Sequence, residues 1–396
     1  MRLRAPLASF AVALAVSFLL RPSAVVAQPH RLDDGLARTP PMGWNTWNKF
    51  GCDVSEKLIE ETADALASSG MRDAGYRYLV IDDCWQVARD SAGVIVADSQ
   101  RFPRGIRAVA DYVHAKGLLF GIYTDAGTKT CQGRPGTLDH EVQDARTYAA
   151  WGVDYVKEDW CNARGLNAPA QYRKFHDALV ATGRPIVLSI CEWGSNRPWE
   201  WAAGTGHLWR TTEDIEDTWS SMLTNLDASA VHQAVAGPGG WNDPDMLEVG
   251  NGRMTDDEYR AHLSMWAIVA APLIAGNDVR TMSAATRGIL TNREVIAVDQ
   301  DSLGVEGWMV SQVTPGQQVW SKPLRNGARA VALLNRTEAP ARMGVEWQEL
   351  GLAKGGRARV RDLWAHAERG VHAGSYAAQV PSHGVVLVTI TPARGH

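Results

Sequence analysis

The stretch Tyr-Val-Lys-Glu-Asp-Trp-Cys at residues 155–161 begins apolar and ends in charged residues, and it is the sharpest of eight such stretches in the chain. Short apolar runs bounded by polar residues are typical of buried strands. In a barrel of parallel strands, the catalytic groups lie at the carboxyl ends of the strands. Acids that recur at those ends therefore indicate an active site built on carboxylates.

The eight stretches share one layout, a short apolar or β-branched run that ends in acids, aromatic residues or an amide. They cover residues 42–47, 78–83, 118–125, 153–159, 185–192, 207–214, 239–245 and 272–278. Segments with helical periodicity separate them, for example residues 55–69, 106–114, 138–150, 168–181 and 256–269. Eight alternations of strand and helix predict an α/β fold, a (β/α)8 TIM barrel, which we assign to residues 28–305.

The pattern changes beyond about residue 305. Short runs that alternate or stay apolar lie at residues 319–323, 330–334, 358–364 and 384–390, and Gly, Pro and Asn-Gly turns separate them. They predict a C-terminal antiparallel β-sandwich domain over residues 306–396. This part of the chain has no comparable cluster of acids at strand ends, so its expected role is to pack against the barrel.

The first 27 residues are expected to be a signal peptide. A basic start at residues 1–4 precedes an apolar stretch at 7–20 and small residues at 24–27. The apolar stretch is short for a membrane span, although an uncleaved anchor is the alternative, and no later segment is long and apolar enough to cross a bilayer. We therefore expect a secreted or periplasmic protein without a membrane partner, in a compartment where disulfides persist.

The composition excludes several function classes. The net charge is -4 and the chain lacks a basic stripe, which argues against a nucleic-acid partner. The histidines are scattered and no Cys-x-x-Cys occurs, so no catalytic metal is expected. The glycines at 237–240 lack the lysine and helix start of a phosphate loop, so no nucleotide cofactor is expected. The oligomeric state stays open.

The strand ends would bring a particular mixture of side chains together. It consists of Trp47, Asp82, Asp83, Tyr123, Asp125, Lys157, Asp159, Glu192, Trp193, Arg210, Asp214, Asp243 and Asp245. Many carboxylates, two cations and several aromatic faces suit a polyhydroxylated ring such as a sugar. Paired carboxylates are also the groups that cleave a glycosidic bond.

Seven of these motifs, in this order, resemble the signatures of glycoside hydrolase family 27. They are Met-Gly-Trp-Asn-Thr-Trp at 42–47, Ile-Asp-Asp-Cys-Trp at 81–85, Gly-Ile-Tyr at 121–123, Tyr-Val-Lys-Glu-Asp at 155–159, Cys-Glu-Trp-Gly at 191–194, Trp-Arg-Thr-Thr-Glu-Asp-Ile at 209–215 and Gly-Gly-Trp-Asn-Asp-Pro-Asp-Met at 239–246. The resemblance covers roughly residues 38–305 and is closest to the plant and bacterial branch. It implies a retaining enzyme that acts on α-galactosides.

The resemblance implies that Asp159 is the nucleophile and Asp214 the general acid/base. The residues themselves suggest a matching electrostatic division. Lys157 points to the same side of its strand as Asp159, and its charge is expected to keep that carboxylate ionised. Asp214 lies among Glu213, Glu216 and Asp217, which are expected to raise its pKa.

The remaining family contacts imply a complete sugar pocket. Asp82 and Asp83 would bind the 4- and 6-hydroxyls, while Trp47 and Tyr123 would wall the pocket. Further contacts would come from Lys157 to ring hydroxyls, from Arg210 to the 2-hydroxyl, from Asp245 and Met246 at the far edge, and from Cys191, Glu192 and Trp193 around the 2-position.

The five cysteines and the flanks of the nucleophile complete the comparison. The resemblance implies Cys52–Cys84 and Cys131–Cys161 bridges, which leaves Cys191 as a thiol in the pocket.

Glu158 and Trp160 differ from the commoner family residues at these positions, Tyr or Phe before the nucleophile and Asn or Gly after it. Strand alternation turns Glu158 away from the pocket, where a paired or solvated acid is expected.

Four alternatives differ in substrate or in class. A Schiff-base aldolase would use Lys157, but Asp159 beside it keeps the lysine charged. A catalytically inactive sugar-binding protein would normally lack one of the two catalytic acids. Within the family, the bulk of Trp193 disfavours an α-N-acetylgalactosaminidase, and Asp83 disfavours a β-L-arabinopyranosidase. The leaving group stays open among raffinose-type oligosaccharides, galactomannan side chains and glycoconjugates.

Overall fold

The N-terminal part of the chain folds around one curved sheet of eight parallel strands in the computed structural model, which describes residues 31–393. The predicted signal peptide lies outside the described residues. The sheet order is β10-β1-β2-β5-β6-β7-β8-β9. The strands are β1 (Met42–Asn45), β2 (Tyr78–Ile81), β5 (Leu119–Asp125), β6 (Tyr155–Asp159), β7 (Val187–Cys191), β8 (Leu208–Arg210), β9 (Trp241–Asp243) and β10 (Leu273–Ala275). All eight predicted strands are present, each shorter than predicted.

The barrel closes through a residue that follows β9. Leu247 forms a parallel bridge with Ala275 of β10. The backbone N–H of Leu247 donates to the carbonyl of Ile274 over 2.8 Å, and the N–H of Gly276 donates back to Leu247 over 3.1 Å. The carboxyl ends of all eight strands therefore meet at one rim, where the predicted site residues lie.

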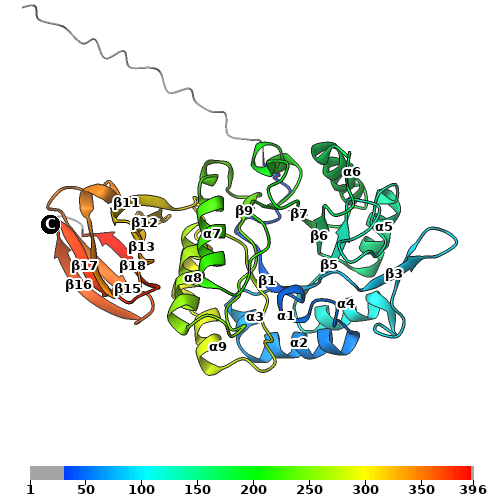
Figure 1. The fold of residues 1–396 in the computed structure, drawn as a ribbon, viewed down its shortest axis with the longest axis horizontal. Helices are drawn as coiled ribbons and strands as arrows, with labels where there is room; N and C mark the ends of the chain where they lie inside the picture. The colour runs from blue at the N-terminus through cyan, green and yellow to red at the C-terminus, as the bar shows by residue number, and fades with distance from the viewer. Residues whose placement is uncertain (1–30, 394–396) are drawn as a thin grey trace, which may run out of the picture.

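Helices surround the sheet (Figure 1). The longer ones are α2 (Glu56–Ser68), α4 (Gly105–Ala115), α5 (Glu141–Trp151), α6 (Ala168–Val180), α7 (Trp219–Ala230) and α8 (Asp256–Ile268), and the shorter ones are α1 (Trp47–Phe50), α3 (Met71–Ala74), α9 (Ala284–Leu290) and α10 (Arg293–Asp299). Local sequence fixes several starts. The Ser55 side chain accepts from the N–H of Leu58 at the start of α2, and Thr255 with Glu258 forms a capping box at the start of α8.

Five tryptophans of the barrel lie in its core. Trp44, Trp85, Trp209, Trp241 and Trp266 are completely buried. Burial of such large rings stabilises the barrel through the hydrophobic effect. Trp47 and Trp193, which were predicted at the site, are only half-buried. A small hairpin of β3 (Gln86–Arg89) and β4 (Ile95–Ala97) extends from the barrel after β2.

The C-terminal part is a β-sandwich, as predicted. One antiparallel sheet has the order β11-β12-β13-β18-β15-β16, and the pair β14-β17 forms a second sheet. The strands are β11 (Trp308–Thr314), β12 (Gln317–Pro323), β13 (Arg329–Asn335), β14 (Ala341–Glu346), β15 (Arg357–Asp362), β16 (Ala367–Ala373), β17 (Ser375–Val380) and β18 (Gly384–Pro392). Val331, Met343, Trp347 and Val360 belong to the apolar core of this domain.

The sandwich packs on the side of the barrel where α7 and α8 lie (Figure 1). Lys322 of β12 is buried, and its ammonium group donates to the carbonyls of Ala267 over 3.0 Å and Asp299 over 3.3 Å. The indole N–H of Trp364 donates to Ser264 of α8 over 2.9 Å. These contacts agree with a packing role for the domain. Within residues 31–393, the helices are all too short or too polar to cross a membrane.

Candidate active site

Asp159 ends β6, in register with Asp125 of β5 and Cys191 of β7. The hydroxyl of Tyr123 donates to its Oδ2 over 3.1 Å, and the backbone N–H of Trp160 donates to its Oδ1 over 3.1 Å. The residue is only 6% exposed. Two donors thus fix the orientation of a nearly buried carboxylate, one on each oxygen.

Lys157 contacts Asp82 rather than the nucleophile. Its Nζ lies 2.9 Å from Oδ2 of Asp82, and the amide of Asn45 donates to the same oxygen over 2.8 Å. The ammonium group also lies over the Tyr123 ring, 5.4 Å from its centre. Lys157 lowers the pKa of Asp159, the direction that was predicted, but its direct contact is with Asp82 at a neighbouring strand end.

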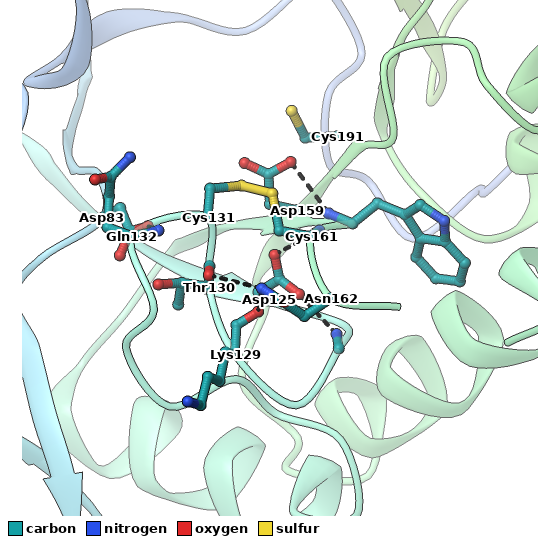
Figure 2. Close-up of a disulfide and its surroundings, with 12 residues drawn as sticks. Asp83, Asp125, Lys129, Thr130, Cys131, Gln132, Asp159, Cys161, Asn162 and Cys191 are labelled. Carbon is teal, nitrogen blue, oxygen red and sulfur yellow. Dashed lines mark hydrogen bonds between the residues drawn. A yellow bond between two sulfur atoms is a disulfide. The ribbon is translucent and has the colours of Figure 1, made fainter. Parts of the chain in front are cut away.

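Two disulfides, Cys52–Cys84 and Cys131–Cys161, hold the loops around these residues, as predicted, and Cys191 is a buried free thiol. The second bridge lies between Asp83 and Asp159 (Figure 2). Its loop also supplies the backbone N–H of Gln132, which donates to Asp83 over 3.0 Å. Asp83 is completely buried, and burial raises its pKa.

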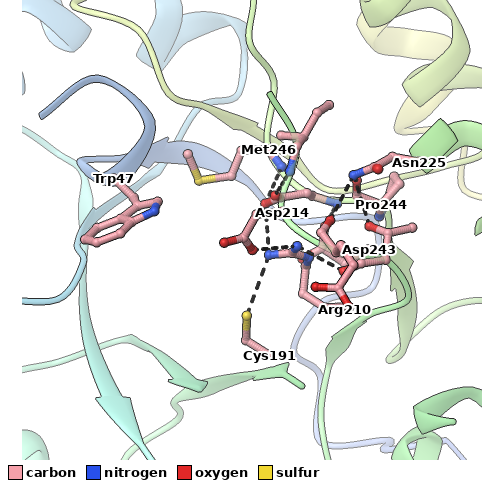
Figure 3. A network of polar contacts seen from close by, with 12 residues as sticks. Trp47, Cys191, Arg210, Asp214, Asn225, Asp243, Pro244 and Met246 are labelled. Carbon is pink, nitrogen blue, oxygen red and sulfur yellow. Dashed lines mark hydrogen bonds and ion pairs between the residues drawn. The ribbon is translucent and has the colours of Figure 1, made fainter. Parts of the chain in front are cut away.

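Arg210 organises the other half of the site (Figure 3). Its guanidinium group lies 3.0 Å from Asp214 and 3.1 Å from Asp245, and it donates to the sulfur of Cys191 over 3.6 Å. Asp245 in turn accepts from the backbone N–H of Ile215 over 2.8 Å. One buried cation thereby positions the predicted acid/base and one wall of the pocket.

The electrostatic division of the two catalytic candidates is the reverse of the predicted one. Burial raises the pKa of Asp159 to about 6, although Lys157 opposes the rise. Partial burial also acts on Asp214, but the positive charges of Arg210 and Lys157 outweigh it and leave its pKa lowered. The prediction counted sequence neighbours of Asp214. Glu213 and Glu216 are exposed to water, which screens them, and the Asp214 side chain is itself 65% exposed.

The residues predicted around the 2-position separate into two groups. Cys191 is buried, and burial raises its pKa well above the ordinary value, so the thiol stays neutral. Trp193 is half-buried and has a positive φ of 55°, an uncommon conformation for a bulky residue. Glu192 is completely buried and accepts from the amide of Asn196 in its own loop over 2.7 Å. The hydrogen bonds of its side chain are to Asn196 in the same loop, so they do not connect it to Arg210, Asp214 and Cys191.

Around the cluster, Trp47 lies across from Arg210, Asp214 and Cys191, and Met246 is nearby (Figure 3). Trp47 is the first residue of α1 and not part of β1. The structure thus joins Asp82, Tyr123, Lys157 and Asp159 in one set of contacts, joins Cys191, Arg210, Asp214 and Asp245 in another, and places Glu192 apart.

Glu158 is buried without a partner, so the prediction of a paired or solvated acid is wrong. It is completely buried, and neither carboxyl oxygen has a hydrogen-bond partner among residues 31–393. Burial raises its pKa well above the ordinary value, and Asp125 and Glu141 add to the rise. The hydroxyl of Tyr172 on α6 donates to its backbone carbonyl over 3.2 Å, which puts an aromatic helix residue beside this strand.

Sequence reasoning gave no individual role to Asp125, which supports the site. Asp125 accepts from the backbone N–H of Gly127 over 2.7 Å and of Cys161 over 2.8 Å, and burial together with the charge of Asp159 raises its pKa to about 8. Its position at a strand end was visible, but its backbone partners were not. Asp125, Asp159 and the sulfurs of Cys131 and Cys161 lie within 4.8 Å of one another. The disulfide removes both thiolates as metal ligands.

Comparison with known proteins connects both domains to one group. A family model described as "Alpha galactosidase A" matches residues 39–301, and one described as "Alpha galactosidase C-terminal beta sandwich domain" matches residues 314–390.

Individual relatives match over almost the whole chain. An "Alpha-galactosidase" of Cyamopsis tetragonoloba is 49% identical and covers 91% of this chain and 88% of its own. An "Alpha-galactosidase A" of Cellvibrio japonicus is 48% identical, with 90% and 93% covered. The crystal structure of alpha-galactosidase I from Mortierella vinacea superposes with a TM-score of 0.86 at 39% identity, and covers 91% of this chain and 98% of that one.

Proposed function

This chain belongs to the alpha-galactosidase family, glycoside hydrolase family 27, and from that premise we propose that Asp159 and Asp214 carry out its retaining hydrolysis of terminal α-D-galactosyl residues. The observation that carries the assignment is the anchoring of Asp159. Its carboxylate accepts hydrogen bonds from Tyr123 and from the N–H of Trp160 at the rim of the barrel. Asp214, by contrast, is exposed to solvent and forms an ion pair with Arg210.

In the first step, an oxygen of Asp159 attacks the anomeric carbon and the bond to the leaving group breaks. Asp214 donates its proton to the departing glycosidic oxygen, and a galactosyl ester forms on Asp159. In the second step, Asp214 takes a proton from water, whose oxygen attacks the same carbon and releases Asp159. Two inversions give net retention, and the mechanism requires the two carboxyl groups about 5–5.5 Å apart.

Below about pH 6, a proton is held on Asp159 in preference to Asp214, because the pKa of Asp159 is raised to about 6 and that of Asp214 is lowered, so substrate binding has to redistribute it. The sugar covers Asp214 and excludes water from it, which favours the protonated acid. The positive charge that develops on the anomeric carbon favours ionised Asp159 in the transition state. Both changes move the proton toward the group that has to donate it.

Recognition of galactose is assigned to carboxylates on the buried side of the site. Asp82 and Asp83 accept hydrogen bonds from the 4- and 6-hydroxyls, and Lys157 donates to ring hydroxyls. Arg210 serves the 2-hydroxyl, and Trp47 and Tyr123 wall the ring, with Asp245 and Met246 at the far edge. Lys157 contacts Asp82 and Arg210 contacts Asp245, which supports a preformed pocket.

The alternatives within the family differ at two positions of the sugar. Trp193 and Cys191 leave little room for the acetamido group of an α-N-acetylgalactosaminide. Asp83 provides an acceptor for the 6-hydroxyl, which arabinose lacks. An inactive sugar-binding protein is disfavoured because both catalytic acids are present. The proposed substrates are therefore α-galactoside oligosaccharides or polysaccharides.

We further propose a secreted or periplasmic location, which the two disulfides support. The proposed domains are the barrel at 28–305 and the β-domain at 306–396. The change from the last barrel helix, which ends at Asp299, to β11, which begins at Trp308, supports this division.

The mechanism is tested by following the first-formed sugar by NMR during hydrolysis of an aryl α-galactoside. The α-anomer is expected first, and the β-anomer would exclude double displacement. Asp159→Ala should lose turnover of every substrate. Asp214→Ala should keep activity on activated aryl galactosides and form a glycosyl azide when azide is added. Equal losses without azide rescue would show that the two roles are assigned wrongly.

A further inference from the structure

The proposed acid/base, Asp214, lies in a loop of residues 211–218 between β8 and α7, which we call the acid/base loop. Asn225 of α7 is buried, and its amide donates to the hydroxyl of Thr212 and to the carbonyl of Glu213, each over 3.1 Å. These acceptors belong to the two residues directly before Asp214. The backbone that carries the acid/base is therefore attached to α7.

The residues that follow Asp214 are attached to α7 and to the start of α8. The backbone N–H of Glu216 donates to the hydroxyl of Ser221 on α7 over 2.9 Å. The hydroxyl of Tyr259 on α8 donates to the carboxylate of Asp217 over 2.9 Å, and both of these residues are buried. The two helices thus hold the acid/base loop on both sides of Asp214 in the sequence.

The C-terminal domain contacts the same two helices in their first turns. The imidazole of His383, in the loop between β17 and β18, stacks on Trp219, the first residue of α7, with the ring centres 5.0 Å apart. Its Nδ1 lies 3.0 Å from a carboxylate oxygen of Glu258 on α8, and its Nε2 lies 3.0 Å from one of Glu338 in its own domain. One side chain of the C-terminal domain therefore connects α7 to α8 beside the acid/base loop.

A second contact of the C-terminal domain holds the other end of α7. Arg336, which directly follows β13, makes a bidentate ion pair with Asp227 in the last turn of α7, over 2.7 and 2.6 Å. Bidentate pairs of this kind fix the geometry of both partners. Because α7 and α8 lie on the side of the barrel that faces the sandwich (Figure 1), the C-terminal domain holds α7 at both ends.

We propose that the C-terminal domain positions the acid/base, an inference that rests on the proposed function of Asp214. His383 and Arg336 hold α7, and α7 holds the loop that carries Asp214. Asp159 ends a strand of the barrel sheet, whereas Asp214 lies in a loop with its side chain 65% exposed. A general acid has to lie within hydrogen-bond reach of the leaving oxygen, and small displacements lower the rate. His383 and Arg336 are positioning residues, because they act through a helix.

The same domain interface supplies matched controls. His366 lies 2.8 Å from Glu294, and Arg361 makes a bidentate pair with the same acid over 2.6 and 2.8 Å. Glu294 belongs to α10, which follows β10 rather than the acid/base loop. His366 and His383 also have similar positive φ angles, 52° and 49°, so glycine replaces either ring without adding backbone strain.

The experiment compares two substrates of the full-length enzyme. The leaving group of phenyl α-galactoside needs the proton of Asp214, and that of 2,4-dinitrophenyl α-galactoside does not. The ratio of their kcat/KM values, measured on one preparation, is independent of the folded fraction. His383→Gly and Arg336→Ala should each lower the phenyl-to-dinitrophenyl ratio about three- to thirtyfold, part of the roughly 10²–10⁴-fold that general acid catalysis contributes. His366→Gly and Arg361→Ala should leave the ratio unchanged.

Failure of this inference is distinguishable from failure of the proposed function. An enzyme that hydrolyses neither substrate, or an Asp214→Ala variant with an unchanged ratio, contradicts the proposed function. A ratio that falls in Asp214→Ala but is unchanged in His383→Gly and Arg336→Ala overturns the positioning role alone. An equal fall in His366→Gly and Arg361→Ala also overturns it, because the effect would then come from loosening the domain interface as a whole.

Discussion

The pH dependence of kcat/KM should distinguish the two acids because leaving groups differ in their need for a proton. A pKa of about 6 in place of 3.8 means that the surroundings of Asp159, burial above all, favour its protonated form by a net of about 3 kcal/mol. The pKa of Asp214 is lowered. Between these values, the pair carries one proton, mainly on Asp159.

The kcat/KM of two substrates should then depend differently on pH, one falling above about pH 6 and the other rising below it. Phenyl α-galactoside needs the proton of the pair for its leaving group, so its kcat/KM should fall about tenfold per pH unit above 6. 2,4-Dinitrophenyl α-galactoside needs only ionised Asp159, so its kcat/KM should rise with pH up to about 6 and then stay level. The assay measures initial rates at low substrate concentration from about pH 4 to about pH 8.

A control is needed because burial also raises the pKa of the neighbouring Asp243 to about 6. Asp243→Asn should keep the opposite slopes of the two substrates. A dinitrophenyl profile that is flat through pH 6 would show that Asp159 is already ionised. Profiles that fall together above pH 6 would show that the group with this pKa is needed protonated for both substrates, which the assignment does not allow.

Three further substitutions test single features of the site. Tyr123→Phe removes the hydroxyl that donates to Asp159 and should move the rise of the dinitrophenyl profile up by about one pH unit, whereas Tyr112→Phe, whose hydroxyl contacts Asp64 at the surface, should not. Glu158→Gln should become more stable than the unmutated protein by about 1.4 kcal/mol per pH unit above the ordinary pKa of 4.5, because the unfolded chain releases a proton that the folded protein retains. Urea unfolding at pH 5 and pH 7 measures this difference, and an equal difference at both pH values would contradict it. Trp193→Ala should raise activity on α-N-acetylgalactosaminides relative to galactosides, and an unmutated enzyme that already cleaves both equally well would place the 2-position wall elsewhere.

The barrel could be predicted from sequence because its strands are apolar on both faces. All eight predicted runs form strands, but β6 ends at the catalytic candidate Asp159 and β8 ends before Asp214. Asp214, for example, follows β8 in a loop that the prediction included in the strand. In the sandwich, β11, β14, β16 and β17 were not predicted. β16, with the sequence Ala-Glu-Arg-Gly-Val-His-Ala, is mostly exposed at a sheet edge and has no apolar pattern to recognise.

The identity of the site residues was more predictable than the contacts between them. Local motifs identified the residues, but contacts such as Lys157 with Asp82 join positions 75 residues apart and depend on how neighbouring strand ends face each other. Sequence neighbours were a poor guide to charge. Asp217 seemed to act on Asp214, yet its carboxylate accepts from Tyr259 and from the N–H of Arg253.

Glu158 shows a second kind of failure, in which the direction of a side chain is predictable but its surroundings are not. Alternation places it on the face opposite to Lys157 and Asp159. In a barrel that face packs against helices, so an acid there loses water without gaining a partner. The prediction of a solvated acid treated the outer face of the strand as a surface, which it is only in a sheet without helices.

The carboxylates that we propose to recognise galactose are fixed by backbone N–H groups, and this bears on discrimination between galactose and glucose. Asp82 accepts from the N–H of Asp83 over 2.9 Å, and Asp245 accepts from that of Met246 over 2.8 Å. Asp245 has a positive φ of 83°, which the surrounding contacts have to maintain. Carboxylates held in this way do not readily turn to follow an equatorial 4-hydroxyl, so glucose would lack the hydrogen bond that we propose for the axial 4-hydroxyl of galactose. A hydrogen bond to a charged group contributes about 1.5–3 kcal/mol. Selectivity for the axial hydroxyl therefore follows from the rigidity of the acceptors as much as from their position.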